Sequence, residues 1–213
     1  YNRLMKKLMT RLFVITCTLL IALTTLLPAS AREDAFDLGR NLYSTNYIFL
    51  DADTGQVLDA KKQDEQISIA SLTKMMTVLL AIENSSSLNE NITITDEMLA
   101  GLYEEQASVA GYISGDVASL LDLCYAAAVP SAADAANALA LQIGGSFEKF
   151  YQMMNDKAAE LGMNHTVFKS AHGLDRDGQY STVEDMSKLL RYALQNPTFK
   201  EIFSTKEYTT QAT

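Results

Sequence analysis

A serine and a lysine three residues apart are the side chains of this chain whose types and spacing best fit covalent chemistry. Ser71 and Lys74 open an apolar stretch, residues 71–83, that has the composition of a helix. Side chains at this spacing lie on one helix face, one turn apart, so the amine can reach the hydroxyl. A serine hydroxyl becomes an effective nucleophile when a base removes its proton, and a lysine can be that base if its pKa is lowered.

The surroundings of Lys74 favour a lowered pKa. The positive field of a helix N-terminus disfavours a charged amine, and burial acts in the same direction. That burial could come from the apolar neighbours Leu72, Met75, Met76 and Leu79. A solvated helix start with Ser71 as its N-cap would give the same Ser-x-x-Lys spacing, so the spacing alone leaves both interpretations open.

The elements that must position this pair are a hairpin and a set of helices. Residues 47–50 and 57–58 have the composition of short strands, and the Asp- and Gly-containing turn between them indicates a hairpin. Helical spacing recurs farther on, with Gly144-Gly145, Gly162 and Asn196-Pro197 as stop signals. The helical segments are residues 71–83, 119–125, 132–143, 147–161 and 182–194. The middle of the chain is therefore predicted to be a wholly helical block.

Longer stretches of the sequence resemble one known family. Residues 50–58 and 67–77 closely resemble the N-terminal signature of the serine-type D-alanyl-D-alanine carboxypeptidases, low-molecular-mass penicillin-binding proteins of peptidase family S11. Residues 115–140 resemble the region that holds the family's Ser-x-Asn motif, and residues 154–175 resemble its scaffold after the helices. The resemblance covers nearly all of residues 47–195.

This resemblance implies roles for three residues. Ser71 would be the acyl-ester nucleophile, Lys74 its proton acceptor, and Ser131 the hydroxyl that passes a proton toward the leaving group. Ala133 occupies the Asn position of the motif. A lost side-chain hydrogen bond costs about 0.5–1.5 kcal/mol, so activity is expected to be reduced but not abolished. Asn137, one helical turn farther on, is not expected to replace the missing amide.

The implied fold class is α/β, or α+β, of the DD-peptidase and β-lactamase kind, with an antiparallel sheet beside a helical region. The family's Lys-Thr-Gly strand, which lines the site opposite the nucleophile, has no counterpart in the 213 residues. We therefore expect residues 47–213 to be an incomplete catalytic domain from which the C-terminal strands are missing, and the chain to be the N-terminal part of a longer protein.

The implied reaction removes the terminal D-alanine from peptidoglycan stem pentapeptides through an acyl-enzyme on Ser71. It uses no metal or other cofactor, and β-lactams should acylate the same serine as inhibitors. Two alternatives remain open. One is a non-catalytic homologue that binds penicillin or peptidoglycan. The other is a class A-like β-lactamase, in which Glu160, four residues before Asn164, would activate a deacylating water.

The two histidines do not have the spacing of a metal site. His165 and His172 lack the His-x-x-Glu-His or similar pattern that a zinc peptidase requires. We expect both to form hydrogen bonds within a loop.

Residues 1–31 are predicted to be a secretory signal peptide. They have a basic start, an apolar run over residues 12–27 and a small-x-small site that ends at Ala31. The run of about 16 apolar residues is short for the roughly 20 that a spanning helix needs. The mature protein is therefore expected outside the cytoplasm, at the outer face of the membrane or in the periplasm, with residues 32–46 as a linker. A C-terminal anchor beyond Thr213 would add membrane association.

Charge and cysteine content exclude other classes of protein. Four of the 17 basic side chains and none of the 26 acidic ones lie in residues 1–31, so the rest of the chain has a formal charge of −13. Such a surface repels nucleic acid, whose binding requires neutralised phosphates. Cys124 is the only cysteine after residue 31, which excludes an intrachain disulfide there and suggests a small buried hydrophobe.

Overall fold

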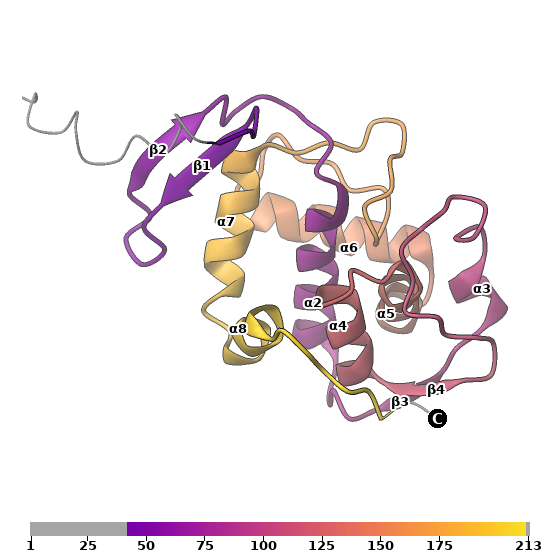
Figure 1. Ribbon diagram of the computed structural model, residues 1–213. Helices are drawn as coiled ribbons and strands as arrows, with labels where there is room; N and C mark the ends of the chain where they lie inside the picture. The colour runs from indigo at the N-terminus through magenta and orange to yellow at the C-terminus, as the bar shows by residue number, and fades with distance from the viewer. Residues whose placement is uncertain (1–41, 212–213) are drawn as a thin grey trace, which may run out of the picture. The chain divides into compact units, whose positions relative to one another are not determined.

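The computed structural model describes residues 42–211, and a central helix, α2 (Thr73–Asn84), organises them (Figure 1). Residues 73–81 of α2 are all buried, because other helices cover this helix on several sides. The predicted signal peptide and most of the predicted linker lie outside the described residues. The helices in contact with α2 are α4 (Leu120–Ala128), α5 (Ala133–Gly144), α6 (Phe147–Glu160), α7 (Val183–Ala193) and α8 (Pro197–Ser204).

Small side chains let α5 pack closely against its neighbours. The buried face of α5 is mostly alanine, with Leu139 as its large member. The helix ends as the sequence predicted, because Gly145 adopts a left-handed φ of 71° at the C-cap. A side chain at Gly144 would collide with the backbone of Phe150, so this glycine allows α6 to begin directly against the end of α5.

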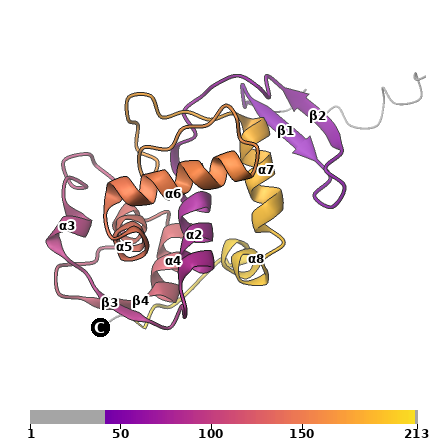
Figure 2. The same cartoon turned by 180° about the vertical axis from the view of Figure 1, so that it is seen from behind.

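The predicted hairpin is present and packs beside α7 (Figure 2). Strands β1 (Tyr47–Leu50) and β2 (Val57–Lys61) pair antiparallel, with a register shift between Phe49 and Leu50. Arg191 of α7 fixes the turn, because its Nε donates to the Ala52 carbonyl at 3.1 Å. This antiparallel pair beside a helical region agrees with the predicted fold class.

The prediction of a wholly helical middle is wrong at one place. Strands β3 (Asn91–Thr93) and β4 (Val117–Ser119) form a second antiparallel pair, and the short helix α3 (Asp96–Leu99) follows β3. Ser119, expected as the first helical residue, is the N-cap of α4 and accepts from the Asp122 amide at 3.0 Å. These strands of three residues are too short for a periodicity signal, and their partners lie far apart in sequence.

The helix α8 was also absent from the prediction. Asn196 and Pro197, interpreted as the stop of the preceding helix, instead start this new one. The Asn196 side chain accepts from the Thr198 and Phe199 amides, and Pro197 occupies the first turn, where a missing N–H costs nothing.

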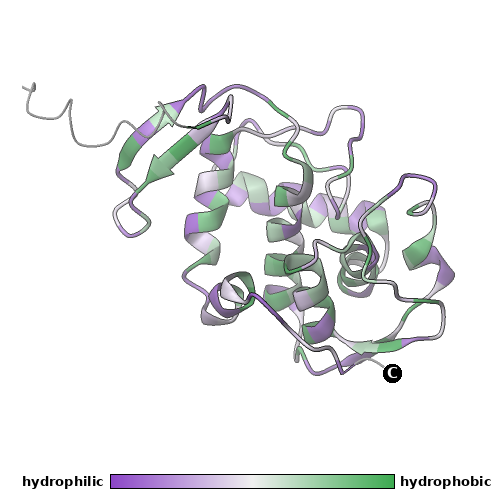
Figure 3. Ribbon diagram, in the orientation of Figure 1, coloured by the Kyte–Doolittle hydropathy of each residue, from purple (hydrophilic) through white to green (hydrophobic). Residues whose placement is uncertain are grey.

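Hydropathy follows this packing (Figure 3). The central helices are mainly apolar, whereas α7 is banded, with Met186, Leu189 and Ala193 buried and polar residues between them. Cys124 is fully buried, in agreement with its predicted role as a small hydrophobe. Within residues 42–211 no helix is long and apolar enough to cross a bilayer.

Candidate active site

Ser71 lies in a tight turn at the entrance to α2. It belongs to the 3-10 helix Ala70–Leu72, whose first residue has a left-handed φ of 43°. The N-cap of α2 is Leu72, and no side chain caps the helix. The Ser71 hydroxyl is therefore not used as a cap, and the residue is exposed to solvent.

The amine of Lys74 is the centre of the site. The residue is only 4% exposed, and its Nζ has three oxygen partners. It donates to Ser71 Oγ at 3.1 Å, to Ser131 Oγ at 3.3 Å and to the carbonyl oxygen of His172 at 2.7 Å. The structure thus brings together all three residues that the sequence selected, although Ser131 is 57 positions from Lys74.

Burial changes the proton affinity of this amine. It lowers the pKa of Lys74 from its ordinary 10.5 to about 8. The oxygen partners in its three hydrogen bonds are two hydroxyls and a carbonyl, which do not compensate a buried positive charge as a carboxylate would. Roughly one Lys74 in ten is then neutral at pH 7 and able to accept a proton.

Ser131 is held in an unusual backbone conformation between α4 and α5. Its φ is 63°, in the left-handed region that costs a residue with a side chain about 1–2 kcal/mol. The flanking residues fix this turn: the Ala132 amide donates to the Ala126 carbonyl at 3.0 Å, and the Ala133 amide donates to the Ser108 carbonyl at 2.7 Å. In this conformation the Ser131 hydroxyl lies 3.3 Å from Lys74 Nζ.

The loop at His172 and Gly173 supplies the third partner of the Lys74 amine. Thr77 donates to the Ala171 carbonyl at 2.6 Å, which ties the loop to α2. Burial, together with the nearby charges of Arg176 and Lys74, lowers the pKa of His172 to about 4, so its imidazole is neutral at pH 7. Its Nδ1 accepts the Leu174 amide at 3.2 Å, a hydrogen bond within the loop.

Sequence reasoning treated this loop as scaffold and missed its contact with the lysine. The group that binds Lys74 is the backbone carbonyl of His172, which has no residue-type signature. Gly173, with a φ of 90°, could have indicated the contact. A side chain there would collide with the Ala70 carbonyl, so only glycine lets the loop approach the serine turn.

A cavity of about 410 Å³ opens beside these groups. Ser71, Lys74 and Ser131 supply its polar side chains, and its lining contains no amide side chain. Asn137 donates to the Met98 carbonyl at 3.1 Å, so it does not replace the amide absent at Ala133. The remaining lining residues are Ile69, Ala70, Leu72, Met75, Ala127, Ala128 and Phe203.

Glu160 lies far from this cavity. Lys157 pairs with both Glu160, at 2.9 Å, and Glu83, at 3.1 Å. Glu83 is near the C-terminal end of α2, roughly 18 Å from Ser71 at about 1.5 Å per helical residue. A carboxylate held there cannot activate a water at Ser71, which removes the geometric basis of the β-lactamase alternative.

The histidines do not meet at a metal-binding arrangement. The His165 amide donates to the Asp185 carboxylate at 2.8 Å, whereas the His172 imidazole accepts the Leu174 amide within its own loop. Over residues 42–211, no three His, Cys, Asp or Glu side chains converge in a way that could hold a metal ion.

Comparison with known proteins gives the family. Residues 29–213 match the family model described as D-alanyl-D-alanine carboxypeptidase, peptidase S11. This chain belongs to that family. It is 33% identical over 165 residues to the D-alanyl-D-alanine carboxypeptidase DacF of Bacillus subtilis, covering 75% of this chain and 41% of the relative. It is 34% identical over 172 residues to DacC of Escherichia coli, covering 76% and 42%.

Solved structures agree with the family assignment. A variant of the DD-transpeptidase of Streptomyces strain K15 is 31% identical and superimposes with a TM-score of 0.77, covering 79% of this chain and 68% of that one. The predicted resemblance and fold class are therefore confirmed. The chain spans about two fifths of the length of the DacF and DacC relatives.

Proposed function

We propose that this protein is a serine-type D-alanyl-D-alanine carboxypeptidase that uses Ser71, Lys74 and Ser131. The observation that carries the proposal is the Lys74 amine, buried and with a pKa lowered to about 8, within hydrogen-bond distance of both serine hydroxyls. Membership in the S11 family supports the same reaction class.

In the proposed acylation, neutral Lys74 accepts the Ser71 proton as Oγ bonds to the carbonyl carbon between the last two D-alanines. The tetrahedral species then collapses, and the C–N bond breaks. Ser131 relays the proton from Lys74 to the departing nitrogen, so D-alanine leaves as a neutral amine that is protonated in water. A water molecule then hydrolyses the ester and returns the proton to Ser71.

Two further residues near the site would affect the reaction, one through Lys74 and one through the substrate. The His172 carbonyl accepts one of its N–H bonds and so fixes the direction of the amine. Ala133 offers the substrate no amide, which is expected to lower the rate without abolishing it.

The proposed substrate is the stem pentapeptide of peptidoglycan, and β-lactams are the expected inhibitors. These are the substrates and inhibitors of the penicillin-binding class that the sequence resembles. Such a substrate lies outside the cytoplasm, which agrees with the predicted signal peptide at residues 1–31. The proposed location is the cell envelope.

Mass spectrometry of the full-length protein tests this function. After incubation with penicillin, a covalent adduct should appear on the peptide that contains Ser71, and a peptide ending in D-Ala-D-Ala should release free D-alanine. Ser71→Ala should give neither signal, with an unchanged circular dichroism spectrum as the folding control.

The other outcomes discriminate between the alternatives. An adduct without D-alanine release would indicate a binding protein that has lost turnover. Rapid release of hydrolysed penicillin would indicate a β-lactamase. No adduct at any penicillin concentration would refute the roles of Ser71 and Lys74.

A further inference from the structure

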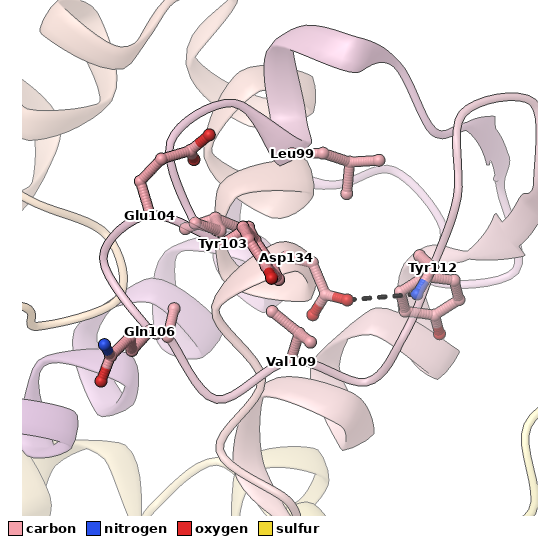
Figure 4. A pocket seen from close by; sticks show the side chains of 9 residues that line it. Leu99, Tyr103, Glu104, Gln106, Val109, Tyr112 and Asp134 are labelled. Carbon is pink, nitrogen blue, oxygen red and sulfur yellow. Dashed lines mark hydrogen bonds between the residues drawn. The ribbon is translucent and has the colours of Figure 1, made fainter.

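A buried carboxylate on α5 binds three successive backbone amides of the neighbouring loop, residues 107–112. Asp134 is 1% exposed and accepts from the amides of Ala110 at 3.0 Å, Gly111 at 3.0 Å and Tyr112 at 3.2 Å. Figure 4 shows the carboxylate pointing from α5 toward Tyr112. Consecutive N–H groups that converge in this way form a concave anion site, and the left-handed φ of 96° at Gly111 is typical of one. Here a side chain of the protein fills that site.

The same loop holds the turn that carries Ser131. The Ser108 carbonyl accepts the Ala133 amide at 2.7 Å, and the Ser108 hydroxyl donates to the Pro130 carbonyl at 3.2 Å. Ser131 therefore lies between two residues that the loop binds directly. Its left-handed φ persists only if these neighbours are kept in place.

Most of this loop is exposed, and Tyr112 is the side chain that it packs against the hydrophobic core. A cavity of about 600 Å³ opens beside the loop, and Val109, Tyr112 and Asp134 are among the residues that line it. Tyr103 and Val109 are largely exposed. Since buried apolar contacts are few here, the hydrogen bonds of Asp134 have a large share in seating the loop.

We propose that Asp134 is a positioning residue for the reaction proposed above. Its carboxylate seats residues 107–112 on α5, the seated loop holds the turn at residues 130–133, and the turn keeps the Ser131 hydroxyl beside Lys74. Asp134 does not touch the cavity next to Ser71, so it acts through the backbone of the loop and not on substrate.

The substitution Asp134→Asn tests this inference in the full-length protein. The amide group replaces an acceptor oxygen with a donor that faces other donors, so at least one loop amide loses its partner. Acylation by penicillin should slow by roughly tenfold. The midpoint of its pH profile should also move above 8, since a loosened turn admits water to Lys74 and weakens the burial that lowers the pKa of this lysine.

Asp116→Asn is the matched control. Asp116 lies four residues after this loop, and its carboxylate accepts one backbone amide, that of Ile113 at 2.9 Å, but it has no hydrogen bond to α5. This variant should acylate at the wild-type rate with the wild-type pH midpoint. A comparable loss in both variants would mean that any damage to the loop slows the reaction, and it would overturn the specific role of Asp134.

A second variant keeps the inference testable if Asp134→Asn does not fold. Ser108→Ala removes only the exposed hydroxyl bond to Pro130 and should slow acylation by roughly two- to fivefold, with little change in melting temperature.

If wild type acylates and a folded Asp134→Asn protein shows the wild-type rate and pH midpoint, the positioning role is wrong while the proposed function stands. If wild type does not acylate, the proposed function itself fails.

Discussion

At the scale of single residues, the site depends on a lysine with hydrogen-bond partners but no counterion among them. A hydroxyl or carbonyl oxygen stabilises an ammonium less than a carboxylate does, so burial dominates and lowers the pKa of Lys74 to about 8. The same oxygens still fix the direction of Nζ. Lys74 is thus held in one position while its pKa stays low enough for the amine to lose its proton near pH 8.

The pH dependence of acylation follows from this arrangement. The neutral amine is the proposed base, so the acylation rate should rise as pH increases through about 8, where Lys74 loses its proton, and level off above it. Stopped-flow acylation with a chromogenic β-lactam between pH 5 and 10 measures the midpoint. A rate independent of pH across 7–9 would contradict the assignment of Lys74 as base.

Replacing the lysine separates its charge from its basicity. Lys74→Arg keeps a cation of similar length, but a guanidinium does not lose its proton in proteins. Acylation should fall by roughly 100-fold or more, the range expected for the loss of a general base. Thermal unfolding of the variant provides the folding control, and near-normal acylation by folded Lys74→Arg would exclude proton transfer through this side chain.

At the scale of elements, the site is built where two loops meet the start of α2. The loop at Gly173 approaches the Ala70 carbonyl so closely that a side chain at 173 has no room. The turn at Ser131 brings its hydroxyl to 3.3 Å from Lys74 Nζ and is held by Ser108. Both segments can reach the Lys74 amine because this residue lies in the first turn of α2.

Gly173→Ala should therefore disturb the site more than an ordinary glycine substitution. The methyl group adds a backbone collision to the strain of a positive φ, so we expect a loss of about 3 kcal/mol in the free energy of unfolding and slower acylation. Gly162→Ala is the control, since Gly162 has a φ of 69° but open space around it, and it should cost only about 1–2 kcal/mol. Equal losses in urea denaturation would refute the close approach.

The elements also show what the sequence could and could not predict. Five helices and the hairpin were found because each is long or has local turn residues, whereas β3, β4 and α3 are too short and depend on distant partners. The spacing of Ser71 and Lys74 singled them out as candidates, and the family resemblance was needed to choose between a catalytic pair and a helix cap. The role of Ser131 also required the family resemblance. The His172 carbonyl and the loop amides that bind Asp134 could not be found, because backbone groups have no residue-type signature.

At the scale of the whole described fold, the segment after α8 returns to α4 and is fastened there. The Tyr208 ring stacks on Tyr125 with centroids 3.7 Å apart and planes 7° apart. Asp122 of α4 accepts from the Tyr208 hydroxyl at 3.0 Å and from the Gln211 amide at 3.1 Å, and it also bonds Ser119 at the start of the helix. One carboxylate thus joins a helix start to the last described residues.

Asp122→Asn should weaken this attachment in a pH-dependent way. Burial acts to raise the pKa of Asp122, but hydrogen bonds from Ser119, Gln211 and Tyr208 outweigh it and leave the pKa below its ordinary 3.8. The stabilisation is therefore complete above about pH 4 and is lost as pH falls below that value. We expect the variant to lose about 2 kcal/mol at pH 7.

Urea denaturation at pH 7 and pH 3 measures this difference. The gap in unfolding free energy between wild type and Asp122→Asn should narrow at pH 3, because the Asp122 carboxyl of the unfolded chain, with its ordinary pKa of 3.8, then binds a proton and the folded state loses that advantage. Glu90→Gln, a change at an exposed carboxylate, is the control and should show no gap at either pH. A difference in unfolding free energy that does not change with pH would mean that the variant is destabilised by altered packing and not by the lost carboxylate charge.

The tyrosine stack also makes the attachment of residues 205–211 visible to spectroscopy. The sequence has ten tyrosines and no tryptophan, so its near-ultraviolet absorption comes mainly from phenol rings. Burial and the nearby Asp122 raise the pKa of Tyr208 to about 12. In an alkaline absorption titration Tyr208 should ionise at a higher pH than the exposed tyrosines. Ionisation of Tyr208 at a lower pH than this would mean that residues 205–211 have separated from α4.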